Sequence, residues 1–258
     1  MRVDGNIGGA IDGTGGGDLA GIAEQVAARM REFVLALQAI WASWQDGSRL
    51  DFRGEFYQHT LMTPMFSPPP NPWGPPPVLL AAVGPRMTTV AAEAADGMLV
   101  HGFTTERYLR EITLPLIHDG LRASGRDRFS ICYPGLVATG DTDADLQTAV
   151  TAVREQLAFY GATPAYRPVL DLHGWADLHT DLHQLSVRGE WAAMTGLIDD
   201  TMLHTFAVVG RPDRVGPEIH RRFGDIVDRY TLYTPYPLPE QTRLRIVTSL
   251  HHATGTAA

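Results

Sequence analysis

Short apolar runs alternate with amphipathic segments through the middle of the chain, and this alternation limits the fold more than any other feature. The apolar runs have the length and composition of buried strands, and the segments after them carry apolar residues at helical spacing. The predicted strands are 78–83, 98–101 and 129–138. Strands that are separated by helices pair in parallel, with the helices covering the sheet. The sequence therefore predicts an α/β fold.

The pattern continues on both sides of these units. Before them, apolar residues at helical spacing predict a helix over 26–44, and Gly47 is placed to end it. Thr104 or Thr105 can cap the helix after the second strand, and Thr142 can cap the helix after the third. The remaining predicted elements are a less regular helical stretch at 164–205, a turn at 207–210, a helix at 212–223 and a last strand at 225–233.

Two segments have an unusual composition. Glycines crowd residues 2–24, but they do not form a G-x-G-x-x-G loop, because Asp18 stands where the third glycine would be. A flexible loop is preferred there to a nucleotide site. Residues 64–77 contain eight prolines in fourteen residues and are predicted to be an extended loop. This loop either covers an enzyme or serves as a PxxP ligand for a recognition domain, and we favour the first.

Charge and cysteine content restrict the partners and the compartment. The net charge of −8 argues against nucleic acid or an anionic membrane as a partner, because both bind a basic surface. The single Cys132 cannot form an intramolecular disulfide and fits a reducing cytoplasm. No apolar run is long enough to span a bilayer. We therefore expect a cytoplasmic protein whose partner is a small-molecule substrate.

Four motifs, taken in this order, resemble the luciferase-like family of enzymes, which use reduced flavin or the deazaflavin coenzyme F-420. The motifs are Ala28-Arg-Met-Arg-Glu-Phe-Val, Phe52-x-Gly-x-Phe-Tyr, Pro77-Val-Leu-Leu-Ala-Ala-Val-Gly-Pro and Ala94-Ala-Asp-Gly-Met. No single motif is diagnostic, but their ordered series is more specific. The resemblance covers about residues 27–240 and is nearest to the actinobacterial branch assigned to deazaflavin-dependent oxidoreduction.

The resemblance implies a TIM barrel of eight βα units, and here that barrel looks incomplete. The helix at 26–44 resembles the one after the fourth barrel strand, yet only one candidate strand, near 3–7, precedes it. About three βα units, on the order of 90 residues, look absent after the first unit. Five strands do not close a barrel of the usual geometry. Either the sheet is open, a partner chain closes it, or the coding sequence is damaged.

On this interpretation the whole chain, 1–258, is a single domain. It holds a remnant of the first strand and helix over 1–25, the later βα units over 26–240, and a C-terminal helix or tail over 241–258. The edge of an unclosed barrel exposes strand hydrogen-bonding groups, so a homodimer is a further expectation.

The best candidate site is the corner Val83-Gly84-Pro85-Arg86, where a predicted strand runs into a helix. Backbone N–H groups and the positive end of the helix dipole face the strand ends at such a corner. Gly84 lets the backbone approach a ligand closely, and Pro85 suits the start of a helix. The resemblance implies that this corner holds the phosphate-bearing tail of coenzyme F-420 or of FMN. The alternative is a plain turn that needs glycine for its geometry.

The segment His101-Gly102-Phe103-Thr104 ends the next predicted strand. The resemblance implies that it forms the second half of the phosphate site, which makes His101, Gly102 and Thr104 candidate cofactor-binding residues. His101 is also the one candidate catalytic residue, near the cofactor ring. The alternatives are a hydrogen-bonded histidine at the barrel rim for His101 and an N-cap for Thr104.

His179 and His183 have the i,i+4 spacing of a helical metal pair, but a packed or solvated helix face is preferred and no metal site is expected. The resemblance implies hydride transfer between an organic substrate and coenzyme F-420, or monooxygenase chemistry with reduced FMN. The alternative is a shortened, non-catalytic family member that binds a cofactor or dimerises.

Overall fold

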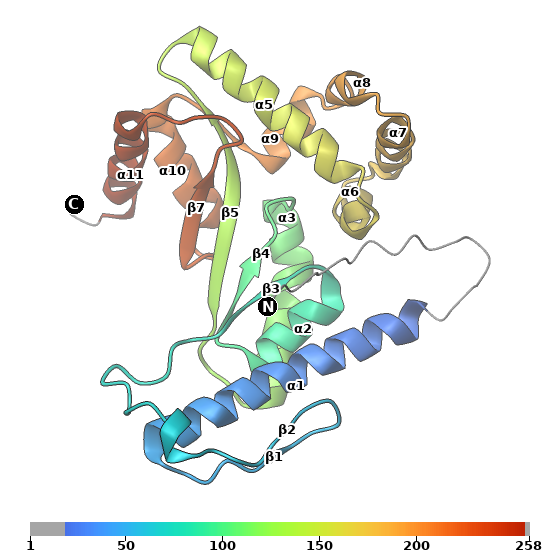
Figure 1. The fold of residues 1–258 in the computed structure, drawn as a ribbon. Helices are drawn as coiled ribbons and strands as arrows, with labels where there is room; N and C mark the ends of the chain where they lie inside the picture. Colours follow the sequence, from blue (N-terminus) through green and yellow to red (C-terminus); the bar gives the residue numbers. More distant parts are fainter. Residues whose placement is uncertain (1–18, 256–258) are drawn as a thin grey trace.

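The computed structural model describes residues 19–255, and their side chains from residue 21 onward. The candidate strand near 3–7 and the glycine cluster before residue 19 lie outside the described residues. The described residues contain one large parallel sheet, and its longest strand runs through the centre of the molecule (Figure 1). The strands of this sheet are β3 (Leu79–Ala82), β4 (Gly97–Val100), β5 (Ser130–Thr139), β6 (Val208–Gly210) and β7 (Arg229–Tyr233).

The sheet order confirms the predicted α/β class and an incomplete barrel. β3 pairs with β4 and β4 with β5, while β5 pairs with β7 through residues 132–136 and with β6 through residues 137–139. All of these pairings are parallel. Within residues 19–255 the strands do not close on themselves, so the sheet is open.

Two of the predicted elements differ in the structure. The segment 207–210 was predicted as a turn, and this prediction is wrong, because Val208–Gly210 pairs with the end of β5 as a strand. A strand of three residues is too short to show a periodicity in the sequence, so it is recognised only from its pairing with β5. The last strand also begins later than predicted, at Arg229 instead of residue 225.

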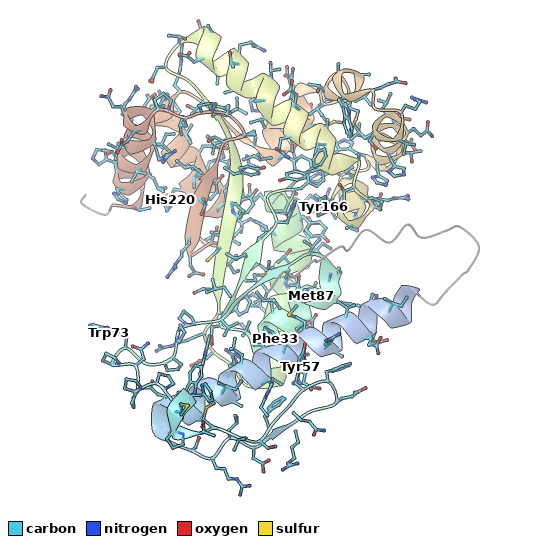
Figure 2. The ribbon with its side chains drawn as sticks, in the orientation of Figure 1. Phe33, Tyr57, Trp73, Met87, Tyr166 and His220 are labelled. Atoms are coloured by element: carbon cyan, nitrogen blue, oxygen red, sulfur yellow. The ribbon has the colours of Figure 1, made fainter. Side chains whose placement is uncertain are left out.

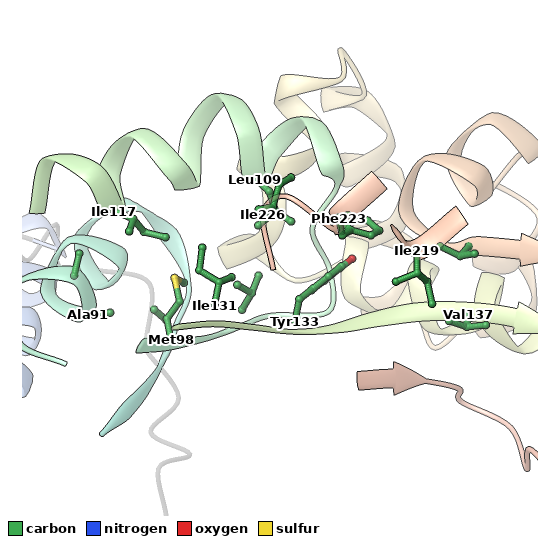
Figure 3. Close-up of a cluster of buried hydrophobic side chains, with 14 of the residues drawn as sticks. Ala91, Met98, Leu109, Ile117, Ile131, Tyr133, Val137, Ile219, Phe223 and Ile226 are labelled. Atoms are coloured by element: carbon green, nitrogen blue, oxygen red, sulfur yellow. The ribbon is translucent and has the colours of Figure 1, made fainter. Parts of the chain in front are cut away.

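Helices cover one face of the sheet and form its main apolar core. The helices are α2 (Gly84–Ala94), α4 (Leu114–Ser124), α10 (Pro212–Phe223) and α11 (Glu240–Thr254). Figure 3 shows Met98, Ile131 and Tyr133 projecting from the strands into this core, where Ile117 and Phe223 meet them from the helices. The rings of Tyr133 and Phe223 lie 5.1 Å apart, centroid to centroid.

The opposite face of the sheet is partly open. Side chains alternate between the two faces of a strand, so Leu99 points away from the core that receives Met98 and Val100. Leu99 is 45% exposed, and Ala81, its partner in β3, is also exposed. In a closed barrel this face would be the interior. Here it leaves apolar surface accessible beside the strand ends.

A second helical layer follows β5, in the stretch predicted as less regular (Figure 1). It contains α5 (Asp143–Gly161), η3 (Pro164–Tyr166), α6 (Arg167–Leu172), α7 (Ala176–Val187), α8 (Trp191–Thr195) and α9 (Asp200–Phe206). These helices enclose a separate core that includes Phe103, Leu157, Leu182 and Phe206. The layer therefore packs against the segment that follows β4, where Phe103 lies.

The first helix, α1 (Leu19–Asp46), is longer than predicted and includes residues 22–25 without a break. It ends before Gly47, as predicted, where φ is 73°. The hairpin of β1 (Phe52–Arg53) and β2 (Gln58–His59) and the turn η1 (Pro64–Phe66) follow it. The Glu32 carboxylate fixes the hairpin to α1 by accepting hydrogen bonds from the backbone N–H groups of residues 55–57. Among residues 19–255, no helix is both long and apolar enough to cross a bilayer.

Candidate functional site

A small pocket lies at the carboxyl ends of β3 and β4, with a cavity volume of about 40 Å³. Its walls come from the β3–α2 corner, the segment after β4, the helical turns α3 (Glu106–Tyr108) and η2 (Leu109–Thr113) with the start of α4, and residues 165–169. The carboxyl ends of parallel strands are where α/β folds place their ligands. The predicted residues that line the pocket are Val83, Gly84, Pro85, His101 and Thr104.

The N-terminus of α2 is open toward this pocket. Val83 occupies the N-cap position, and its side chain makes no capping hydrogen bond. Pro85, in the first turn, has no N–H group, so the free donors at this end are the N–H groups of Gly84 and Arg86. These donors and the helix dipole favour an anion.

Gly84 has φ of +77°, a conformation that side chains rarely adopt, and a Cβ there would meet nothing within 4 Å. The glycine is therefore required by the backbone of the corner and not by crowding. The need for glycine geometry, which the sequence left as the alternative for this corner, is confirmed, and binding of a cofactor here stays a prediction.

Thr104 supplies the second half of the site. Its side chain is 4% exposed, and its hydroxyl oxygen has no hydrogen-bond partner among the described residues. The neighbouring Thr105 is the N-cap of α3, because its hydroxyl oxygen accepts the N–H of Tyr108 at 3.1 Å. Of the two threonines that the sequence offered as the N-cap, Thr105 therefore takes this role and Thr104 does not. A buried hydroxyl without a partner is costly. A cofactor-binding role of Thr104 stays a prediction.

His101 is hydrogen-bonded on both ring nitrogens. The N–H of Phe103 donates to Nδ1 at 3.1 Å, so Nδ1 carries no proton, and the neutral ring holds its proton on Nε2. Nε2 lies 3.0 Å from the Tyr166 hydroxyl, and the two rings stack with centroids 4.2 Å apart. Burial lowers the pKa of His101, which keeps the ring neutral at neutral pH. As a result, Nε2–H donates to the Tyr166 oxygen and leaves the Tyr166 hydroxyl proton free for another acceptor.

Two of the predicted cofactor-binding residues do not line the pocket. Arg86 is exposed and does not line the pocket, although its N–H belongs to the open end of α2. Gly102 is buried, and a Cβ at this position would lie 3.1 Å from the Pro134 carbonyl oxygen and from the Tyr233 ring. Gly102 therefore allows the chain to pass close to the neighbouring strands. A direct role of either residue in cofactor binding stays a prediction.

Tyr166 is the main residue that sequence reasoning missed. It lies in η3, sixty-five positions after His101. The helical layer brings it to the pocket (Figure 2). No local spacing connects these two residues, because their contact depends on how the helical layer packs. The π-helical turn η2 also contributes Ile112 and Thr113 to the pocket. Turns of this kind are frequent at functional sites but have no sequence signature.

The histidine pair of α7 packs against the end of α5. His179 Nδ1 lies 2.8 Å from the Gly161 carbonyl oxygen, and His183 Nδ1 lies 3.1 Å from that of Ala162. Each ring satisfies a carbonyl that the end of α5 leaves without a helical partner. His179 is buried and His183 is exposed, so the pair forms the packed or solvated helix face that the sequence favoured.

The model of the luciferase-like monooxygenase family matches residues 8–229 of the chain. The chain belongs to this family. A relative from Mycobacterium tuberculosis, whose function is not characterised, is 55% identical over 205 residues, covering 79% of this chain and 60% of its own length. The 5,10-methylenetetrahydromethanopterin reductase of Archaeoglobus fulgidus is 29% identical over 222 residues, covering 80% of this chain and 61% of its own. This member of the luciferase-like family therefore spans about three fifths of these relatives.

Solved structures agree with this family fold. The coenzyme F-420-dependent tetrahydromethanopterin reductase of Methanopyrus kandleri superposes with a TM-score of 0.65 at 20% identity, covering 86% of this chain and 61% of that one. An EDTA monooxygenase from Chelativorans superposes with a TM-score of 0.58 at 16% identity, covering 90% and 60%. At these identities the likeness concerns the fold alone. The fold neighbours of this chain thus include a coenzyme F-420-dependent reductase and a monooxygenase.

Proposed function

We propose that the chain is an oxidoreductase that binds coenzyme F-420, or alternatively FMN, with the phosphate of the cofactor in the pocket between α2 and Thr104. When bound, such a cofactor supplies hydride transfer to or from an organic substrate. The protein supplies the position of the ring and the electrostatics around it. The luciferase-like relatives support the class of cofactor, because one of the superposed enzymes depends on coenzyme F-420.

The unpartnered hydroxyl of Thr104 carries this proposal. The open end of α2 would suit any anion, but by itself it does not imply a ligand. Thr104 is buried beside it with an unused donor, and both line one pocket at the strand ends. A phosphate oxygen in this pocket would accept from the Thr104 hydroxyl and from the N–H groups of α2 at once.

The open face of the sheet provides the place for the ring in this proposal. Ala81 and Leu99 come two residues before Val83 and His101, so each pair shares a face of its strand. The flat cofactor ring would cover this apolar surface, and His101 would lie between the ring and the phosphate. His101 is neutral and donates its one proton to Tyr166, so we assign it a positioning role toward Tyr166.

A second candidate is a non-catalytic member that binds the cofactor, pairs with another copy through the open sheet, or does both. His101, Tyr108 and Tyr166 are the titratable side chains among the described residues that line the pocket. Burial raises the pKa of each tyrosine and lowers that of His101, so each pKa is shifted away from neutral pH, where general acids and bases work best. Cofactor binding without turnover, together with a dimeric mass in solution, would favour this second function.

The deciding experiment is a fluorescence titration of the purified chain with coenzyme F-420 and, separately, with FMN, followed by a screen for substrate-dependent redox turnover. Thr104→Val removes the hydroxyl and keeps the shape. We expect it to weaken binding about tenfold or more, as for a lost hydrogen bond to a charged group.

Thr139→Val is the matched control. Thr139 also has a buried, unpartnered hydroxyl, but it lines a different hollow, beside Tyr236. Its replacement is expected to leave cofactor affinity unchanged. Absence of saturable binding to the folded wild-type chain, or an equal loss in both variants, would refute the proposed site.

A further inference from the structure

The pocket between α2 and Thr104 has a lining without charged side chains. No Asp, Glu or Arg of the described residues lines it, and the sequence has no lysine. Arg86 is the nearest arginine in sequence, and its side chain is exposed outside the lining. Phosphate sites usually contain a guanidinium or ammonium group, because it balances the charge of the ligand. Here such a balancing group is missing from the described lining.

The positive potential that remains is small. The N-terminus of α2 contributes the equivalent of about half an elementary charge. The N–H of Phe103 occupies Nδ1 of His101, and burial lowers the pKa of this ring, so His101 adds no cation at neutral pH. Tyr108 and Tyr166 stay protonated, because burial raises the pKa of both hydroxyls. The pocket therefore offers hydrogen-bond donors but little net charge.

The donors suit the two free oxygens of a phosphodiester. Gly84, which has a backbone N–H group at the start of α2, and Thr104, which has an unpartnered hydroxyl, both line the pocket. Tyr166 contributes a third donor, since Nε2–H of His101 occupies its oxygen and leaves its proton free. A phosphomonoester has a further oxygen and a charge of about −1.5 to −2 at pH 7, which needs more compensation than these donors give.

We propose that this pocket selects a singly charged phosphodiester over a doubly charged phosphomonoester. The inference rests on the proposed function and makes it more specific. Coenzyme F-420 carries its phosphate as a diester, whereas FMN carries a monoester. The charge of the phosphate would therefore make this chain a deazaflavin-binding member of its family, and FMN a weak ligand.

The direct test compares two ligands that differ by one charge. FMN and its methyl phosphodiester share the ring, the ribityl chain and the phosphate, and riboflavin serves as the ligand without phosphate. At about pH 8 the methyl diester is expected to bind about tenfold more tightly than FMN. At about pH 6, near the second pKa of the monoester, this gap should narrow, because FMN then carries less charge.

The titratable groups of the pocket are His101, Tyr108 and Tyr166. Protonation of His101 in acid would favour FMN, the more highly charged ligand, and would narrow the gap as well, so the comparison at about pH 8, where the ring is neutral, decides the inference. Equal or tighter binding of FMN at about pH 8 would overturn the inference while leaving the proposed function intact. If neither FMN, the diester nor coenzyme F-420 binds, the proposed function itself fails.

A gain of charge provides the second test. Ala165 lines the mouth of the pocket from η3 and is exposed, so a longer side chain is accommodated without disturbing the core. Ala165→Arg is expected to raise FMN affinity about tenfold relative to Ala165→Gln, which has similar reach and no charge. The diester should gain less. An equal gain for both ligands, or no gain for either, would contradict selection by charge.

Discussion

The β3–α2 corner and the β5–α5 corner have the same topology, a parallel strand that leads into a helix at the carboxyl edge of the sheet. Their helices nevertheless begin differently. At α5, the Thr142 hydroxyl accepts the N–H of Asp145 at 3.1 Å, and the Asp145 carboxylate accepts the N–H of Thr142 at 3.0 Å. At α2, the corresponding position is Val83, which caps nothing. One corner satisfies its own donors, and the other has no side-chain cap for them.

In our proposal, this difference separates a structural corner from a binding corner. A capping box removes the donors of the helix and places a carboxylate where an anion would bind. The start of α2 keeps its donors, and Thr104 stands beside it with an unused hydroxyl. The same fold element therefore stabilises the chain at one strand end and, in our proposal, binds phosphate at another.

The largest effect is expected when the β3–α2 corner, the open corner, is given a side-chain cap like that of the β5–α5 corner, the closed corner. Val83 has the extended backbone of an N-cap, with φ −127° and ψ 129°, and is 43% exposed. Val83→Asp would cap α2 and place a negative charge at the phosphate site. We expect cofactor affinity to fall more than about hundredfold, while stability rises by about 0.5–1 kcal/mol.

Val83→Asn separates the two parts of this effect. It caps the helix without adding charge, so its affinity should fall less than that of Val83→Asp, while its gain in stability should be similar. Titration calorimetry gives the affinities, and urea unfolding gives the stabilities. Wild-type affinity in Val83→Asp would show that the phosphate lies elsewhere.

A smaller effect concerns the glycine of the open corner. Gly84→Ala places a side chain at φ +77°, which is expected to cost about 1–2 kcal/mol, measurable as a lower melting temperature. Gly125, at the end of α4, has φ +67° and equally open surroundings, so Gly125→Ala should cost about as much. Only Gly84→Ala should also weaken cofactor binding, because relief of its strain rotates an N–H group of the site. Equal affinities in the two variants would place Gly84 outside the site.

The closed corner gives the next effect. Thr142→Ala removes one half of the capping box and is expected to lower the free energy of unfolding by about 1 kcal/mol. Cofactor affinity should stay at the wild-type value, because the start of α5 is already satisfied without a ligand. Loss of affinity in a fully folded Thr142→Ala variant would show that the two corners are coupled.

The sequence indicated these corners to different degrees. Apolar runs and the Thr142-x-x-Asp145 pattern locate β5 and the start of α5, since both signals are local. The open corner is located by its strand and by Gly84, but its function depends on which of two adjacent threonines caps α3. Which threonine caps α3, and the position of Tyr166 at the pocket, both depend on tertiary packing. Local spacing in the sequence therefore does not predict them.

The smallest effect is a pH dependence that arises at the open corner. Burial lowers the pKa of His101 in the folded chain below its unfolded value near 6.5. Above that value both states hold a neutral ring, so His101 makes no pH-dependent contribution. As the pH falls below the unfolded value near 6.5, the unfolded chain binds the proton first. The free energy of unfolding then decreases until the ring in the folded chain also titrates.

His101→Asn should remove this loss of stability. Its amide oxygen can accept the Phe103 N–H in place of Nδ1 and does not titrate, so urea unfolding at about pH 7.5 and about pH 5.5 should show a smaller loss than in the wild type. Burial also lowers the pKa of His173, which donates or accepts at Thr105 beside the capped start of α3. His173→Asn therefore measures how much of the loss of stability in acid comes from the capped start of α3. If the two single variants lose stability like the wild type, neither histidine carries the acid sensitivity, and the neutral ring assigned to His101 loses its support.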